Sequence, residues 1–260
     1  MPSTVEDKLD QQASFDQRFR QLYAHEAGHY DQVRFKNTKG HLFDLEEQMR
    51  IHALLGLRRG QTLLDVAAGT GRIAVYLAEQ QLRVTALDLT PNMLRKAQAR
   101  AAATAAAIRH INFVEGNGRL LPFPGGLFDG VISIRFLHLL PVSLHRPFIL
   151  EMWRMVRPGG VLLVEFDNAL AGLGAVTWGR ELYRRLVLGH KPRHYVWPHQ
   201  IAPLFADIPN ISLHGFWFFG AHVWRRVHPP SERSVERLSA DGGRSFLANR
   251  IFVRAVKAAA

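Results

Sequence analysis

Cysteine is absent from the 260 residues of this sequence. The absence excludes disulfide bonds, thiolate metal sites and enzyme mechanisms that attack the substrate through a thiolate. Long apolar runs are also missing, since no stretch reaches the roughly 18 uninterrupted apolar residues of a membrane span. The polar start MPSTVEDKLDQQ lacks the apolar region of a signal peptide, so we expect a soluble cytoplasmic protein.

Acidic residues are fewer than basic ones, 22 against 33, which gives a formal net charge of +11. Such an excess attracts nucleic acid or an anionic membrane surface. Part of it lies toward the carboxyl-terminal end, for example at Arg180, Arg184 and Arg185. Arginine is frequent throughout the chain, however, and charge runs are usually solvated faces. We therefore do not favour a nucleic-acid partner, and we keep peripheral membrane contact as an alternative.

The stretch from Gln61 to Ala74, QTLLDVAAGTGRIA, predicts a buried strand, a glycine-rich turn and a helix. Its first part, TLLDV, is nearly continuously apolar, as in a parallel strand covered on both faces. Gly69 and Gly71 allow the main chain to bend tightly and to approach a ligand closely. Asp65 lies at the carboxyl end of the strand, where open α/β sheets bind their ligands.

Two kinds of nucleotide ligand compete for this turn. GTGRIA also fits the dinucleotide pattern G-x-G-x-x-A, and Asp88 follows Gly71 by 17 residues. A carboxylate there would accept hydrogen bonds from the ribose hydroxyls of either ligand. Asp65 distinguishes between the two kinds of ligand, because a negative charge repels a diphosphate and attracts a methionine-type ammonium. The residues therefore favour a ligand that carries a methionine-type ammonium over NAD.

The motifs LLDVAAGTG and VTALDLT together resemble the class I S-adenosylmethionine-dependent methyltransferases. Further matches follow in order, namely the L-P-F loop in residues 119–123, the strand FDGVIS and the element RPGGVLLVE. These motifs cover about residues 60 to 166. The resemblance implies an α/β fold, a Rossmann-like seven-stranded mostly parallel sheet with helices on both faces, and S-adenosylmethionine as cofactor.

The expected organisation is a helical N-terminal lid in residues 1–57 and a methyltransferase core in residues 58–260. The lid pattern indicates helices broken near Gly28 and Gly40. The matches thin beyond Asp167, so we expect substrate-specific insertions there. After the strand of the glycine turn, strands are predicted at residues 82–87, 111–114, 128–133, 161–166, 211–219 and 250–256.

The resemblance also implies which residues bind the donor. In the segment YDQVR, Tyr30 and Arg34 would reach it, with Arg34 pairing its carboxylate bidentately. Leu89 and Met93 would line an adenine slot. Where the family usually has an acid that contacts the adenine amino group, this sequence has Asn117, whose carbonyl can still accept from that amine. The full predicted set comprises Tyr30, Arg34, Asp65, Ala67, Gly69, Gly71, Asp88, Leu89, Met93, Asn117, Gly118 and Arg135.

Two local expectations concern the turns beside these residues. Thr90 is expected to cap the helix that begins at Pro91. Ala67 stands where the family often has the first glycine, and a loop with ordinary φ would tolerate its methyl group, so we expect binding to survive. Ala67 and Asn117 nevertheless support an alternative, a fold relative that binds the nucleotide without transferring methyl.

His138 is the catalytic candidate. It lies in the segment from Ile134 to His138, which follows the predicted fourth strand, where a methyl acceptor would meet the donor. A neutral imidazole near pH 7 can take a proton from a hydroxyl or an amine as the methyl arrives. The alternative role is to orient the backbone or the substrate.

A zinc-protease pattern, H-E-x-x-H, occurs as HEAGH from His25 to His29. Zinc binding would need both imidazoles on one face of an intact helix and a third ligand downstream. Gly28 weakens such a helix. We therefore expect no metal.

The aromatic run GFWFFGAHVW, residues 215–224, fits either a buried strand or an apolar acceptor pocket. The expected function is methyl transfer to an oxygen, nitrogen or carbon of a small, apolar or aromatic acceptor. The alternatives are methylation of RNA, favoured by the basic charge, and of a lipid quinone, favoured by the aromatic run. The sequence does not determine the oligomeric state.

Overall fold

The computed structural model describes residues 38–171, 194–218 and 248–259, and the isolated positions 17, 20, 179, 182, 183 and 186. The predicted donor contacts Tyr30 and Arg34, the HEAGH motif and the aromatic run beyond Phe218 lie outside these residues. Within them, no helix is long and apolar enough to cross a bilayer.

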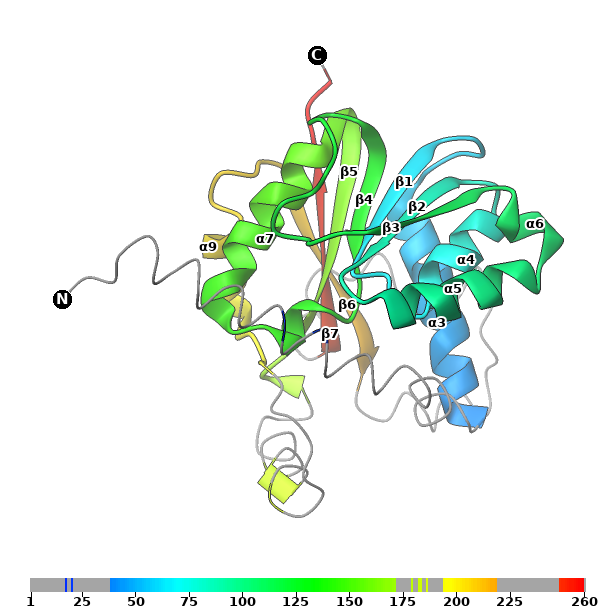
Figure 1. Cartoon of the computed structure of the whole chain (residues 1–260). Helices are drawn as coiled ribbons and strands as arrows, with labels where there is room; N and C mark the ends of the chain where they lie inside the picture. Colours follow the sequence, from blue (N-terminus) through cyan, green and yellow to red (C-terminus); the bar gives the residue numbers. More distant parts are fainter. Residues whose placement is uncertain are drawn as a thin grey trace.

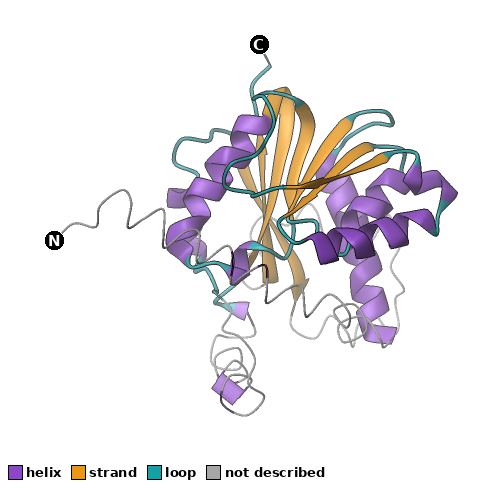
Figure 2. Cartoon of the chain, viewed as in Figure 1, coloured by secondary structure: helices purple, strands orange, loops and turns teal. Residues whose placement is uncertain are grey.

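Seven strands form one sheet at the centre of the described chain (Figures 1 and 2). They are β1 (Thr62–Val66), β2 (Arg83–Asp88), β3 (Ile111–Glu115), β4 (Phe128–Ser133), β5 (Val156–Asp167), β6 (Ile211–Phe218) and β7 (Ala248–Val256). Their order is β3-β2-β1-β4-β5-β7-β6. Strands β1 to β5 pair in parallel, and β7 runs antiparallel between β5 and β6. The predicted Rossmann-like, mostly parallel seven-stranded sheet is confirmed.

Helices cover both faces of the sheet. They are α3 (Thr38–Leu55), α4 (Arg72–Glu79), α5 (Pro91–Ala102), α6 (Ala105–Ile108), α7 (Val142–Met155), α9 (Pro198–Leu204) and the 3-10 helix η1 (Leu137–Leu139). Figure 1 shows α7 and α9 on one side, and α3 to α6 on the other. Strand side chains alternate between these sides, so that Leu63 packs with α3 and α4 while Leu64 and Val66 pack with α7.

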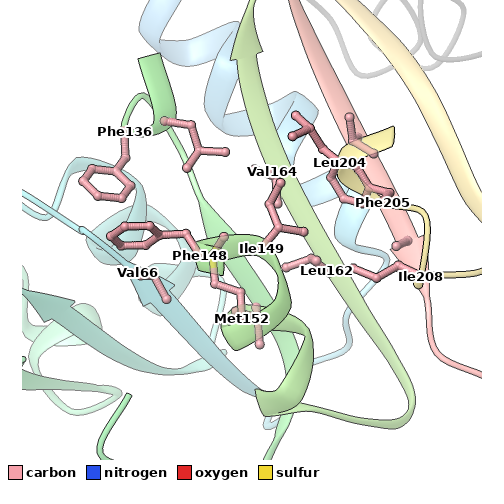
Figure 3. Close-up of a cluster of buried hydrophobic side chains, with 14 of the residues drawn as sticks. Val66, Phe136, Phe148, Ile149, Met152, Leu162, Val164, Leu204, Phe205 and Ile208 are labelled. Atoms are coloured by element: carbon pink, nitrogen blue, oxygen red, sulfur yellow. The ribbon is translucent and has the colours of Figure 1, made fainter. Parts of the chain in front are cut away.

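The α7 face buries more of the aromatic side chains of the described core than the opposite face does (Figure 3). Phe148 and Met152 of α7 lie against Val66 and Val164, and Phe205 follows α9 on the same face. The rings of Phe136 and Phe148 meet edge to face, with centroids 5.3 Å apart. This face therefore brings α7 and the segment after β4 into contact beside the end of β1.

Helix α3 is packed in the core of the opposite face. Its residues Ile51, Leu54 and Leu55 are buried in one cluster with Leu63 and Ile73. It is described from Thr38 and runs through Gly40, and the predicted break near Gly40 stays a prediction, because residues 21–37 lie outside the described part of the chain. Residues 38–55 thus belong to the core packing, and a lid formed by the preceding residues stays a prediction.

Candidate functional site

A pocket lies at the carboxyl ends of β1, β2 and β4. The chain leaves β1 toward β2 on one side and β4 adjoins it on the other, so this is the point where the strand order reverses and where α/β sheets bind ligands. The empty space amounts to about 1020 Å³, part of it open to solvent. Nine predicted donor-binding residues line it: Asp65, Ala67, Gly69, Asp88, Leu89, Met93, Asn117, Gly118 and Arg135.

The two glycines of the turn have different tasks. Both have left-handed backbones, with φ of +57° at Gly69 and +73° at Gly71. A Cβ on Gly69 would meet nothing within 4 Å, whereas one on Gly71 would lie 2.7 Å from the Cβ of Ala97. Gly69 therefore leaves space beside the pocket. Gly71, which is not among the residues of the pocket wall, allows α4 to pack closely on α5, and its contact with the ligand stays a prediction.

Ala67 also has a left-handed backbone, with φ of +62°. The expectation of ordinary φ at this position is therefore wrong. The main chain must turn sharply between the end of β1 and Ala68, whose N–H donates to the carbonyl of Leu87 at 3.0 Å. The alanine thus stands in a conformation that costs an L-residue about 1–2 kcal/mol.

Asp88 joins the two loops that border the pocket. Its Oδ2 accepts the N–H of Gly69 at 2.8 Å, and its Oδ1 accepts the N–H of Thr90 at 2.8 Å. Burial raises the pKa of this carboxyl, and the N–H donors oppose that shift. Thr90 is the N-cap residue of α5, but its hydroxyl makes no capping hydrogen bond and binds Asp88 instead. The predicted capping bond is therefore wrong, although α5 begins at Pro91 as expected.

Asp65 is 3% exposed at the end of β1. Burial raises its pKa to about 8, the charge of Asp88 adds to the shift, and Arg72 opposes it. When no positively charged ligand is bound beside Asp65, this carboxyl group is mostly protonated at pH 7. Asp65 therefore repels a diphosphate less than the permanent negative charge assumed from the sequence would. An ammonium group placed beside Asp65 would stabilise its ionised form.

The comparison with known families agrees with this geometry. A family profile described as a methyltransferase domain matches residues 63–160, which span β1 to the start of β5 and include the glycine turn and Asp88. Residues 63–160 of this chain are thus similar to a methyltransferase domain.

Relatives match this domain over part of their length. An uncharacterized protein of Mycobacterium tuberculosis is 44% identical over 105 residues, which are 40% of this chain and 36% of that protein. A demethylmenaquinone methyltransferase of Deinococcus radiodurans is 38% identical over 119 residues, 44% of this chain and 47% of that protein. The chain thus matches between about a third and a half of the length of these relatives.

Solved structures share the fold. The magnesium protoporphyrin IX methyltransferase of Synechocystis, determined with bound S-adenosylhomocysteine, has a TM-score of 0.58 and 16% identity. The match covers 85% of this chain and 88% of that chain.

The described part of the methyltransferase domain fits its cofactor. The open space beside Gly69 lets a ligand approach the main chain, and the carboxyl groups of Asp65 and Asp88 are suited to an ammonium and to ribose hydroxyls. Leu89 and Met93 add an apolar wall for a base. Among the described residues, no group of three or more His, Cys, Asp or Glu side chains is arranged to hold a metal ion.

Asn117 and Gly118 lie in the wall, as predicted. The carbonyl Oδ1 of Asn117 already accepts the N–H of Arg119 at 3.0 Å, which uses one of its two acceptor positions within the loop. A Cβ on Gly118 would lie 2.9 Å from Val66 and 3.0 Å from the ring of Phe148. Gly118 therefore allows the loop to approach β1 and α7 closely.

The structure does not bring His138 to the described pocket wall. Its side chain is 3% exposed within η1, and its backbone carbonyl accepts the N–H of His194 at 2.8 Å. Its neighbours Phe136, Leu139 and Leu140 do line the pocket. The tight 3-10 turn thus turns these apolar side chains to the pocket and His138 away from it, and its role as a base stays a prediction.

Sequence reasoning missed several residues of the wall. Ala68, Thr70 and Arg72 adjoin the glycine turn, so the motif itself was a usable signal for them. Phe148 lies on α7, 79 residues beyond Gly69, and no sequence spacing connects the two. Only the packing of α7 beside β1 brings it to the pocket.

We predict that Ala67→Gly stabilises the protein by about 0.5–1 kcal/mol, because glycine removes the left-handed strain and loses part of that gain to unfolded-chain entropy. Urea unfolding measures this. Ala68→Gly is the matched control, since Ala68 is not among the residues with positive φ, and this change should destabilise by about 0.5–1 kcal/mol. A loss of stability in Ala67→Gly would contradict the left-handed backbone conformation of Ala67.

Asp65 should make stability depend on pH. Between its ordinary pKa of 3.8 and its folded value of about 8, the unfolded chain releases a proton that the folded chain keeps, so stability falls as pH rises through this window. Asp65→Asn should therefore gain stability relative to the parent from pH 5 to pH 8, by at most about 1.4 kcal/mol per pH unit. Urea unfolding at several pH values measures the difference.

Asp129→Asn is the control for this pH series. The hydrogen bonds of Asp129 to Thr62, Arg157 and Gln61 outweigh its partial burial and lower its pKa to about 2. Its contribution to stability is therefore lost only as pH falls below about 4. The difference between this variant and the parent should stay constant from pH 5 to pH 8, and a constant difference for Asp65→Asn as well would refute the assigned pKa.

Proposed function

We propose that the chain is an S-adenosylmethionine-dependent methyltransferase whose acceptor is a small, apolar or aromatic molecule. The pocket at the strand-order reversal carries this proposal. Its wall combines Asp65 and Asp88 with apolar side chains from the segment after β4 and from α7.

Asp88 would bind the ribose hydroxyls of the donor, Asp65 its ammonium group, and Leu89 and Met93 its base. When bound, the cofactor supplies a methyl group activated by a positively charged sulfur. The chain's own task is then to hold the donor and acceptor in line and to keep water out, and such positioning is worth about 7–11 kcal/mol in well-oriented reactions. Little acid–base assistance is needed.

The apolar acceptor is supported by the side chains that border the pocket beyond the donor residues. Phe136, Leu139, Leu140 and Phe148 line this part, and the first three follow β4, where an acceptor would meet the donor. Apolar and aromatic walls with few polar groups suit an apolar ligand. A lipid quinone is the second candidate, supported by the similarity to the demethylmenaquinone methyltransferase of Deinococcus radiodurans.

Two measurements test the proposal. Calorimetry should show binding of S-adenosylmethionine and S-adenosylhomocysteine and none of NAD, and tight NAD binding alone would refute the donor assignment. Labelled methyl transfer should then occur to small phenols or to a reduced naphthoquinone that lacks its ring methyl. Transfer only to RNA would refute the acceptor class, and donor binding without transfer to any acceptor would support the non-methylating alternative.

Asp88→Ala should weaken the binding of both S-adenosylmethionine and S-adenosylhomocysteine by about 1–3 kcal/mol, because the ribose is common to both. The loss includes the two N–H bonds that Asp88 accepts from the pocket loops. Calorimetry with each ligand measures it. The control is Glu151→Gln on α7, since Glu151 is not part of the described wall and binds the N–H of Leu121. Unchanged affinity in Asp88→Ala would refute the ribose contact.

A further inference from the structure

Glu47 of α3 is a buried carboxylate that contacts two arginines of the pocket wall. Its side chain is fully buried, and its Oε2 pairs with Nη2 of Arg72 and lies 3.9 Å from Nη1 of Arg135. Its Oε1 lies 3.6 Å from Nη1 of Arg250 on β7. Arg72 and Arg135 both line the pocket. One carboxylate therefore faces three guanidinium groups directly behind the donor site.

Further carboxylates complete the cluster. Asp44 of α3 also pairs with Arg72, and Glu165 pairs with Arg250. The backbone N–H of Arg135 donates to Oε2 of Glu165 at 2.7 Å. The alternation of β5 places Glu165 on the same face as Leu163, which α3 covers. The cluster thus ties α3 to β5, β7 and the segment after β4.

The backbone of Arg135 is held in an uncommon conformation by this cluster. Its φ is +59°, in the left-handed region that non-glycine residues rarely adopt. Its guanidinium lies 5.5 Å from the ring centroid of Phe43 on α3. The contacts with α3 and Glu165 therefore determine where this charged residue lies at the pocket.

Glu47 is ionised at neutral pH. Burial favours the protonated form, but Arg72, Arg135 and Arg250 together lower the pKa of Glu47 below its ordinary value. Loss of the negative charge of Glu47 would make the net charge of the cluster behind the pocket wall more positive by one unit. A positive wall disfavours a ligand with a positively charged sulfur more than the same ligand after the methyl has left, because the product sulfur is neutral.

We propose that Glu47 is a positioning residue of the donor site, which holds Arg72 and Arg135 against α3 and offsets their charge, and so raises the affinity for S-adenosylmethionine relative to that for S-adenosylhomocysteine. The inference rests on the proposed function. It also assigns α3 a task in donor selection, since the helix that carries Glu47 is packed by its apolar residues on the same core. A shift of this kind reduces inhibition by the demethylated product.

The test compares two ligands that differ by one methyl and one charge. Calorimetry at constant salt gives the affinities of Glu47→Gln for S-adenosylmethionine and S-adenosylhomocysteine. The ratio should shift toward S-adenosylhomocysteine roughly tenfold, the effect of a unit charge acting over about 10 Å at an effective dielectric constant of about 20. Glu47→Asp keeps the charge, so both affinities should fall together and the ratio should stay near that of the parent.

Asp129→Asn is the matched control. It removes a carboxylate that pairs with Arg157 near the amino end of β4, at the opposite edge of the sheet from the pocket. It should lower stability and leave the ratio unchanged. If Glu47→Gln does not fold, Asp44→Asn takes its place, because it removes the other carboxylate on Arg72 from a partly exposed position. The ratio should shift in the same direction.

The outcomes separate the two proposals. Equal weakening of both ligands in the folded variant, or an equal shift in Asp129→Asn, would overturn the role of Glu47 and leave the methyltransferase proposal standing. A parent protein that binds neither ligand would overturn both. A shift confined to the variants that lose a carboxylate on Arg72 supports the inference.

Discussion

The two hydrogen bonds that Asp88 accepts hold together the loops on which the pocket depends. They tie Gly69, in the turn after β1, to Thr90, at the start of α5. Each loop follows a parallel strand, and the strands lie side by side, with Asp65 opposite Ala86 in the ladder. The carboxylate therefore serves as a structural link in the described chain before any ligand binds. A ribose contact at Asp88 would add to that task rather than replace it.

Charge is distributed unevenly between the two faces of the sheet. The α7 face buries mainly apolar side chains, with His145 among them, whereas the α3 face buries acids and arginines at the carboxyl ends of the strands. Both arrangements follow from the alternation of side chains along the strands, which separates Val164 and Phe166 from Glu165 and Asp167. The pocket lies where these faces meet, so it has an apolar wall and a charged wall. That division matches the proposed placement of a charged donor against an apolar acceptor.

Two of the four non-glycine residues with positive φ in the described chain lie beside the pocket. Ala67 and Arg135 follow β1 and β4, and both have positive φ although neither is glycine. Such conformations persist where the surroundings determine them, and they often occur at binding sites. In this chain the ladder of β1 with β4 brings the two residues to the same edge of the sheet. The ends of these two strands are thus shaped for the pocket rather than for the lowest local energy.

The strand segments along the chain, the glycine turn and the acids at Asp65 and Asp88 could be predicted from sequence, because apolar periodicity and turn residues act over short stretches of chain. Strand β4 was predicted with its observed bounds, and β7 was predicted from Arg250 and begins at Ala248. The left-handed backbone of Ala67, the inward packing of α3, the place of Phe148 and the cluster around Glu47 were not predictable. Each depends on contacts between segments far apart in sequence. The sequence by itself determined which elements form and which ligand chemistry they suit, and only the tertiary structure decided which side chains share the pocket, since burial and pairing exist only in the folded chain.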